Sequence, residues 1–191
     1  MHFDPELHHR RSIRWEGYDY SSRGLYFVTI CTHNREPFLS RIEHGQSILT
    51  APGEIVRSSW SAVPTRFPAI ELGPFMVMPN HVHGILVNVG RASTEKEEKK
   101  EGAASSAPTL GAILRAFKSL SAIAINKRWG RSGQAVWQRN YYEHVIRDGR
   151  EMRIIQRYIL ENPARWDSDP ENTNAKSRDT AAPWEATGKR E

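Results

Sequence analysis

The chain has 191 residues, which is enough for one domain with tails, and a formal net charge of +5 at pH 7. This length does not fit a (β/α)8 barrel, because that fold usually needs about 200 residues or more. A pI of about 9.5 favours an anionic partner, most often nucleic acid, although a merely basic soluble protein would carry the same charge. The only cysteine is Cys31, which excludes a disulfide framework and a cysteine-based zinc site.

No apolar run approaches the roughly 20 residues of a membrane span. The beginning of the sequence, "MHFDPELHHRR", also lacks the apolar core of a signal peptide. We therefore expect a cytoplasmic protein with no membrane partner.

The first half of the chain predicts three strands and one helix. Residues 1–23 are polar and arginine-rich and are expected to form a basic N-terminal arm. Residues 24–33, "GLYFVTICTH", are β-branched and aromatic and predict a central strand. Residues 45–66 carry apolar side chains at roughly helical spacing and predict a helix whose extent is limited by Pro52 and Pro64. Residues 70–89 predict two apolar strands joined by a tight turn at residues 79–80.

The second half adds a flexible insertion, two helices and a strand. Residues 90–108 combine a charge run with small residues, which cannot bury enough apolar surface to fold alone. Residues 109–130 follow the helical apolar pattern, residues 135–148 alternate like a strand, and residues 148–166 form a last amphipathic helix. Residues 167–191 are polar and aperiodic and predict a disordered tail.

The resulting order is β-α-β-β-α-β followed by an extra helix. It predicts an α+β fold with an antiparallel sheet of the ferredoxin-like or RRM-like kind, in a single domain over residues 24–166. A fold of this kind serves many functions, so function has to come from particular side chains.

Two histidines interrupt the apolar strand "MPNHVHGILV", residues 78–87. Side chains at i and i+2 share one face of a strand, so His81 and His83 project together while Val82 points the other way. Two such imidazoles can share a metal ion, or they can be hydrogen-bonded structural residues. A cupin-type jelly roll also carries a metal-binding His-x-His strand, but the predicted helices argue against that fold.

The last helix carries a phenol and a carboxamide near each other. Tyr158 and Asn162 in "QRYILENP" are four residues apart, so they lie one above the other on one side of a helix. Each has a simpler interpretation, since Asn162 can cap the helix before Pro163 and Tyr158 can belong to the core.

Taken together, these motifs resemble a known family. "MPNHVHGIL", "VWQRNYYEHVIRD" and "YILENP" occur in this order, with a basic helix "LGAILRAFKSLSAIAINK" between the first two. This combination resembles the REP-associated tyrosine transposases of the HUH superfamily, as does the opening region "RRSIRWEGYDYSSRGLYFVTICTHNREPFL". The resemblance covers roughly residues 10–166, and the charged insertion and the tail depart from the family pattern.

The resemblance implies a metal-dependent enzyme that cleaves single-stranded DNA at palindromic repeats folded as hairpins. Tyr158 would be the nucleophile, leaving a 5′-phosphotyrosine and a free 3′-hydroxyl, and a divalent ion would be bound by His81, His83 and Asn162. A phenol has a free pKa near 10, so a cation is needed to stabilise its charged form. Two imidazoles and an amide leave positions open for DNA oxygens, which fits Mg²⁺ or Mn²⁺ better than Zn²⁺. Such a protein could act as a monomer or a homodimer.

Other residues of the predicted strand compete for roles in the site. Tyr141 and Tyr142 are rival nucleophiles, but neighbours on a strand point to opposite faces, so at most one can face the metal. Tyr158 is preferred to both. His144 could contact DNA or support the site, or it could be a hydrogen-bonded structural histidine.

Two basic clusters are predicted to hold DNA phosphates, with nearby aromatic rings stacking on unpaired bases. The predicted DNA-binding residues are Arg10, Arg11, Arg14, Trp15, Arg115, Lys118, Lys127, Arg128 and His144. The alternative function is an RRM-like module that binds single-stranded nucleic acid without cleaving it. Formation of a covalent protein–DNA adduct would separate the two.

Overall fold

A computed structural model describes residues 23–90, 108–175 and 184. The secondary structure elements in chain order are β1 (Gly24–Cys31), η1 (His33–Arg35), β2 (Ser40–Glu43), β3 (Gln46–Leu49), α1 (Ala51–Ser61), α2 (Val63–Arg66), β4 (Ile70–Val77), β5 (His81–Asn88), α3 (Leu110–Arg128), β6 (Tyr142–Ile146), α4 (Gly149–Glu161) and η2 (Asn162–Ser168). Outside the described residues lie most of the predicted insertion and the basic arm with Arg10, Arg11, Arg14 and Trp15.

The main sheet has four strands in the order β4-β5-β1-β6, and every neighbouring pair is antiparallel. β1 lies at the centre and pairs with β5 along its whole length, from Gly24 opposite Asn88 to Cys31 opposite His81. The predicted α+β class with an antiparallel sheet is confirmed. So are the central strand, the two strands within residues 70–89 and the two long helices that follow them.

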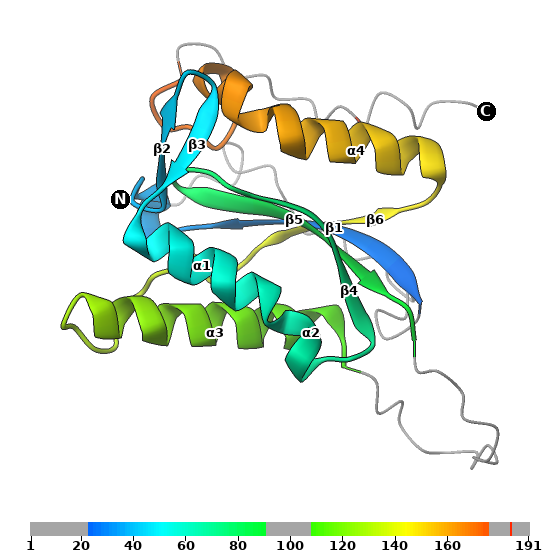
Figure 1. Ribbon diagram of the computed structural model, residues 1–191, viewed down its shortest axis with the longest axis horizontal. Helices are drawn as coiled ribbons and strands as arrows, with labels where there is room; N and C mark the ends of the chain where they lie inside the picture. The colour runs from blue at the N-terminus through cyan, green and yellow to red at the C-terminus, as the bar shows by residue number, and fades with distance from the viewer. Residues whose placement is uncertain (1–22, 91–107, 176–183, 185–191) are drawn as a thin grey trace, which may run out of the picture.

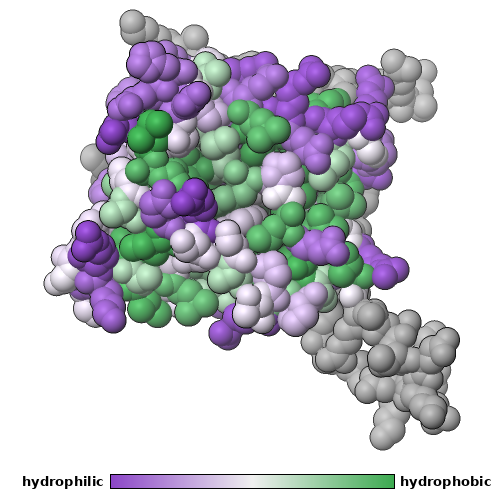
Figure 2. Space-filling model, in the orientation of Figure 1, coloured by the Kyte–Doolittle hydropathy of each residue, from purple (hydrophilic) through white to green (hydrophobic). Residues whose placement is uncertain are grey.

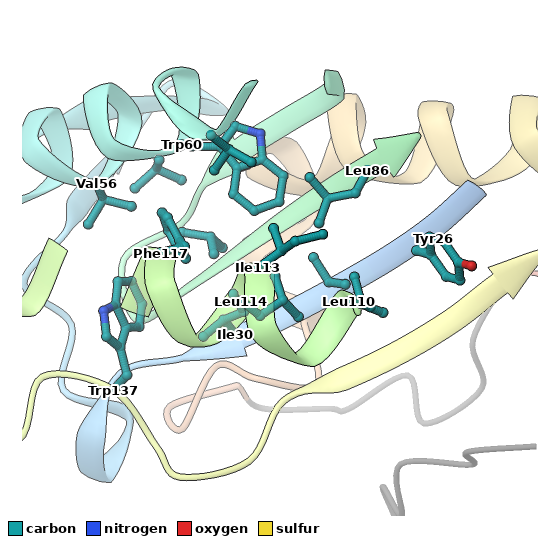
Figure 3. Close-up of a cluster of buried hydrophobic side chains, with 14 of the residues drawn as sticks. Tyr26, Ile30, Val56, Trp60, Leu86, Leu110, Ile113, Leu114, Phe117 and Trp137 are labelled. Carbon is teal, nitrogen blue, oxygen red and sulfur yellow. The ribbon is translucent and has the colours of Figure 1, made fainter. Parts of the chain in front are cut away.

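Helices cover both faces of the sheet. α1, α2 and α3 pack against one face, and α4 lies across the other (Figure 1). Side chains of β5 alternate between the two layers. Val82 and Leu86 belong to the core beneath α1 and α3, where Figure 3 shows Leu86 with Trp60, whereas Ile85 lies with Phe27 beneath α4. The two cores are therefore built from alternate residues of the same strands.

The predicted helix over residues 45–66 is wrong in its first part. Residues 40–49 form a hairpin of β2 and β3, in which His44 and Gly45 have φ of 50° and 73°. Two central residues with positive φ are typical of the tight turn that joins twisted antiparallel strands. The helix α1 begins after Thr50, whose side chain accepts a hydrogen bond from the backbone N–H of Gly53 (3.2 Å). The apolar residues at 48–49 belong to the strand, although their spacing also fits a helix.

The predicted strand over residues 135–148 is shorter than expected. Only β6 joins the sheet, while Trp137 makes an isolated bridge with Thr32. Trp137 is buried, and its indole N–H donates to the hydroxyl of Ser121 (2.9 Å). Trp137 is therefore a core residue.

The predicted disordered tail does not hold for residues 167–175. α4 ends at Glu161, and the chain continues through the 3-10 helix η2 into a turn where Asp169, Glu171 and Asn172 are buried. Trp184 is also buried. Residues 167–175 are held in place mainly by hydrogen bonds of polar groups. They therefore have no apolar periodicity that a sequence pattern could reveal.

The outer surface differs between the two helical layers. α4 presents three exposed arginines, Arg150, Arg153 and Arg157, and Figure 2 shows polar side chains over this helix. On the other side, an apolar cavity of about 500 Å³ lies between α1, α2 and α3, lined by Phe67 and Leu120 among others. Within residues 23–90 and 108–175, no helix has the length and apolar character needed to cross a membrane.

Candidate active site

The histidine pair lies at the start of β5 and points toward α4. His81 and His83 are fully buried, and they share their face of the strand with Ile85 of the α4 core. Their Nε2 atoms are 2.9 Å apart. Two ring nitrogens from alternate residues of one strand therefore converge on a single point.

The tautomer of His81 is set by its neighbour Asn80. The Asn80 Nδ2 donates to the backbone carbonyl of Glu171 (2.7 Å), which turns the amide oxygen toward His81. That oxygen lies 2.8 Å from His81 Nδ1 and can only accept, so Nδ1 carries the proton. The neutral His81 ring then directs the lone pair of Nε2 toward the point on which the two Nε2 atoms converge, as a metal ligand must.

The tautomer of His83 can change. Its Nδ1 lies 2.9 Å from the hydroxyl of Thr29 on the neighbouring strand β1. A hydroxyl can donate or accept, so His83 can hold its proton on Nε2 and donate to His81, or hold it on Nδ1 and donate to Thr29. In the second state both Nε2 lone pairs face the same point, which is favourable only with a cation there.

Tyr158 lies on α4 beside this pair. Its ring centroid is 5.2 Å from the His83 ring, and its ring also makes edge contacts with Phe27 and Trp184. The helix is seated by Ile155 and other apolar residues of the α4 core. It is capped by Asp148, whose side chain accepts from the backbone N–H of Glu151 (2.8 Å); this bond lowers the pKa of the Asp148 carboxyl.

Asn162 directly follows α4 and is 2% exposed. Its Nδ2 donates to the Oδ2 of Asp169 (2.8 Å), which fixes the orientation of the amide. Its Oδ1 is buried and finds no hydrogen-bond partner among the residues that the structure describes. Such an atom loses the free energy of its bonds to water, so a buried amide oxygen left this way fits a place where an ion or a water binds.

Asp169 joins the site from the segment after η2 and was missed in the sequence. Its carboxylate and the ring nitrogens of His81 and His83 offer ligand atoms that all lie within 4.8 Å of one another, and all three residues are buried. The stretch "NPARWDSDPEN" shows only an acidic, proline-containing segment. No motif in it marks Asp169 as a ligand.

The rival tyrosines are separated as expected for neighbours on a strand. Tyr141 packs against the core of α1 and α3, and Tyr142 against the core of α4. Across the sheet, Tyr142 pairs with Thr29 and Thr29 with His83, so two strand spacings of about 4.8 Å each separate Tyr142 from His83. Of the three tyrosines, Tyr158 and Tyr142 face the histidine layer, and Tyr158 lies in ring contact with His83.

His144 is hydrogen-bonded to an acidic residue, Glu151. Its Nε2 lies 2.8 Å from Oε1 of Glu151, and the other oxygen of Glu151 accepts from the backbone N–H of Arg147 (2.7 Å). These bonds tie β6 to the first turn of α4. They suit a residue that positions α4, and a contact between His144 and DNA stays a prediction.

The predicted DNA-binding cations of α3 do not lie with the histidines. Arg115, Lys127 and Arg128 are exposed, but α3 packs on the opposite face of the sheet. Lys118 donates to the carbonyls of Gln138 (2.6 Å) and Arg139 (2.8 Å), and burial lowers its pKa. Lys118 therefore holds the loop before β6.

Within the part of the chain that the structure describes, α4 contributes positive charge on the side of the site. Arg150, Arg153 and Arg157 are exposed on the helix that carries Tyr158. Their spacing of three and four residues places them along one side of a helix. This spacing is visible in the sequence and could have indicated a basic stripe.

Comparison with known proteins finds a relative by sequence and a shared fold among solved structures. No family model matches the chain. A curated protein of Haemophilus influenzae, named only as uncharacterized, is 37% identical over 176 residues, covering 87% of this chain and 95% of that protein. Among solved structures, a REP-associated tyrosine transposase bound to a REP hairpin superposes with a TM-score of 0.51 at 21% identity, covering 78% of this chain and 72% of that one. This structural likeness shows a shared fold.

Proposed function

We propose that this chain is a metal-dependent transposase that cleaves and rejoins single-stranded DNA. It belongs to the same family as the Haemophilus influenzae protein and has the fold of a REP-associated tyrosine transposase. The observation that carries the proposal is the placement of Tyr158 against a buried histidine pair whose ring nitrogens converge. A structural histidine pair would not need a phenol on the adjacent helix or an unsatisfied amide oxygen at its end.

The donor atoms fit a divalent ion. The Nε2 atoms of His81 and His83 lie 2.9 Å apart, so one ion could be held by both rings. The unsatisfied Oδ1 of Asn162 supplies an oxygen donor. These nitrogen and oxygen donors could hold a divalent ion, for which Mg²⁺ and Mn²⁺ are the candidates. When bound, the ion would polarise and orient the scissile phosphate.

The chemical step belongs to Tyr158. Its oxygen attacks the phosphorus, a new O–P bond forms, and the bond from phosphorus to the 3′ oxygen breaks with its electron pair going to that oxygen. The phenol loses one proton and the leaving 3′ oxygen gains one. Rejoining is the reverse reaction with another 3′-hydroxyl as attacking group, so the number of P–O bonds is conserved and no energy source is consumed.

The proposed substrate is DNA with palindromic repeats that fold as hairpins. The solved structure with this fold contains a REP hairpin. For this chain, support comes from the net charge of +5 and from the exposed arginines beside Tyr158 on α4. The predicted basic residues of the N-terminal arm would add phosphate contacts.

The test is covalent capture of DNA. Single-stranded hairpins taken from inverted repeats beside the coding region, labelled at the 3′ end, are incubated with the protein and Mn²⁺ and then denatured. We expect a labelled adduct with the wild type and with Tyr142→Phe, and none with Tyr158→Phe or in the presence of EDTA. Tyr142→Phe is the matched control, since it also removes one hydroxyl from the α4 layer.

Two results would contradict the proposal. An adduct that survives Tyr158→Phe and disappears with Tyr142→Phe would assign the nucleophile to β6. Hairpin binding by the wild type without any adduct, with several hairpin sequences, would support the non-catalytic single-strand binder.

A further inference from the structure

We propose that Asp169 is a ligand of the metal ion, so that the site is a two-histidine, one-carboxylate centre completed by the segment that follows η2. The inference rests on the metal site of the proposed function and adds a charged ligand to it. Its basis is the cluster of His81, His83 and Asp169, whose ligand atoms lie within 4.8 Å of one another.

Asp169 is a buried carboxylate with neutral partners. It is 3% exposed, and it accepts from the side-chain amide of Asn162 (2.8 Å) and from the backbone N–H of Glu171 (2.6 Å). Within the described part of the chain, no lysine, arginine or histidine forms a salt bridge with it. A buried negative charge is unfavourable unless a positive charge balances it. A divalent ion beside His81 and His83 would supply that charge.

The carboxylate has lone pairs left for an ion. An ionised carboxylate accepts at about four positions, and each oxygen of Asp169 takes one of the two hydrogen bonds. These bonds hold the group in place in the manner of outer-shell donors around metal ligands. Asn162 thereby serves the site twice, with its amide nitrogen on Asp169 and its unsatisfied oxygen as a further donor.

The segment that carries Asp169 is anchored close to the histidines, at the end of β1, in η1 and at the residue before β5. The carboxylate of Glu171 pairs with Arg35 (2.8 Å) and accepts from the thiol of Cys31 (3.4 Å) at the end of β1. Its backbone carbonyl accepts from Asn80, whose amide oxygen sets the tautomer of His81. One turn of chain therefore fixes both the carboxylate ligand and the protonation of a histidine ligand.

A charged ligand changes what the site can hold. Two imidazoles with one amide are neutral donors, whereas adding Asp169 gives a negative site that can retain an ion before DNA arrives. Imidazole ligands favour Mn²⁺ over Mg²⁺, because Mg²⁺ prefers oxygen donors and keeps its waters. We therefore expect the protein to bind Mn²⁺ in the absence of DNA, and more tightly than Mg²⁺.

The experiment measures Mn²⁺ binding to the full chain without DNA, by electron paramagnetic resonance of the free ion. Asp169→Asn is compared with Asp167→Asn, which removes one carboxylate from an exposed position two residues earlier, in η2. We expect the dissociation constant for Mn²⁺ to rise about 10-fold to 100-fold with Asp169→Asn and to stay within about two-fold with Asp167→Asn. An Asp169→Asn protein that binds Mn²⁺ as tightly as the wild type, or a wild type that binds none, would overturn the inference.

A second measurement needs no variant and covers the case in which Asp169→Asn does not fold. The wild type is prepared with ¹³C-carboxyl aspartate and examined by electron–nuclear double resonance of bound Mn²⁺. We expect the hyperfine coupling of a directly coordinated carboxylate, and its absence would contradict the inference. Among the described aspartates, only Asp169 belongs to the histidine cluster.

These outcomes are independent of the cleavage test. A covalent adduct together with unaltered Mn²⁺ affinity in Asp169→Asn would leave the transposase proposal standing and remove Asp169 from the metal. Loss of Mn²⁺ affinity in Asp169→Asn without any adduct from the wild type would keep the metal centre and remove the transposase proposal.

Discussion

The two faces of the central sheet differ in what they bury. Beneath α1 and α3 lies a core of aliphatic and aromatic side chains that includes Val82, Leu86 and Trp60. Beneath α4 the buried groups include polar ones: the two histidines of the candidate site and Thr29. Apolar burial stabilises a fold without direction, whereas buried polar groups are tolerated only when their bonds are satisfied. We infer that the face beneath α1 and α3 stabilises the fold, whereas the face beneath α4 carries the candidate active site.

The same two strands build both faces, because side chains alternate along β1 and β5. Val82 is part of the apolar core, and its neighbours His81 and His83 point the other way. A shift of one residue in the register between β1 and β5 would exchange the two sets. The apolar core thus fixes the position of the histidines, although it does not touch a substrate.

The largest expected effect on function comes from breaking the polar face. Replacing His83 with Ala removes a proposed ligand, and we expect the rate of adduct formation to fall by about 1,000-fold or more, since the ion's contribution to the transition state is several kcal/mol. Hairpin affinity should stay within a few-fold, because it rests on phosphate contacts elsewhere. The two quantities are measured by covalent capture and by fluorescence anisotropy. Joint loss of binding and folding would instead make His83 a structural residue.

Breaking the apolar face should reduce stability and spare the chemistry. Trp60 is 2% exposed, stacks on Phe75 (4.6 Å between centroids) and contacts the edge of Phe117. Replacing Trp60 with Ala should lower the free energy of unfolding by about 3–5 kcal/mol, measured by urea denaturation. At a temperature where this variant is folded, its rate of adduct formation should match that of the wild type. A selective loss of activity would mean that the two faces are coupled.

A smaller effect is expected where the two strands meet at the site. Replacing Thr29 with Val keeps the shape of the side chain and removes the hydroxyl that lies 2.9 Å from His83 Nδ1. Loss of this support should raise the dissociation constant for Mn²⁺ by about 10-fold, as measured by calorimetry. Unchanged affinity would show that His83 reaches its metal-binding tautomer without Thr29.

The smallest effect concerns the outer surfaces of the two layers. Changing both Arg150 and Arg153 of α4 to Gln should weaken hairpin binding by about 10-fold and reduce the salt dependence of the binding constant, because phosphate contacts are lost. The matched control changes Arg115 and Lys127 of α3 to Gln, again removing two exposed charges, and should alter affinity by less than about three-fold. A larger effect from the α3 pair would mean that DNA approaches the other face.

The sequence predicts the parts of this fold that depend on apolar repetition. The central strand, the β4–β5 hairpin and the two long helices follow from alternating or helical spacing, and the position of His81 relative to His83 follows from the period of a strand. The β2–β3 hairpin was missed because its apolar residues also fit a helix. The charges of α3 were recognised, but spacing along a helix does not say which face of a sheet that helix covers.

Asp169 shows a different limit. Its place beside the histidines depends on hydrogen bonds with Asn162 and Glu171 and on the ion pair of Glu171 with Arg35. Individual hydrogen bonds and ion pairs between polar residues leave no periodic trace in the sequence. Polar segments that close a site are therefore the part that only the structure reveals.

The most direct test of the account is to identify the residue that carries the DNA. After covalent capture and nuclease trimming, trypsin separates Tyr158 in the peptide 158–165, "YILENPAR", from Tyr141 and Tyr142 in the peptide 140–147, "NYYEHVIR". Mass spectrometry of the digest should find the added nucleotide on the peptide 158–165. A nucleotide found on the peptide 140–147 would contradict the assignment of Tyr158 and move the nucleophile to β6.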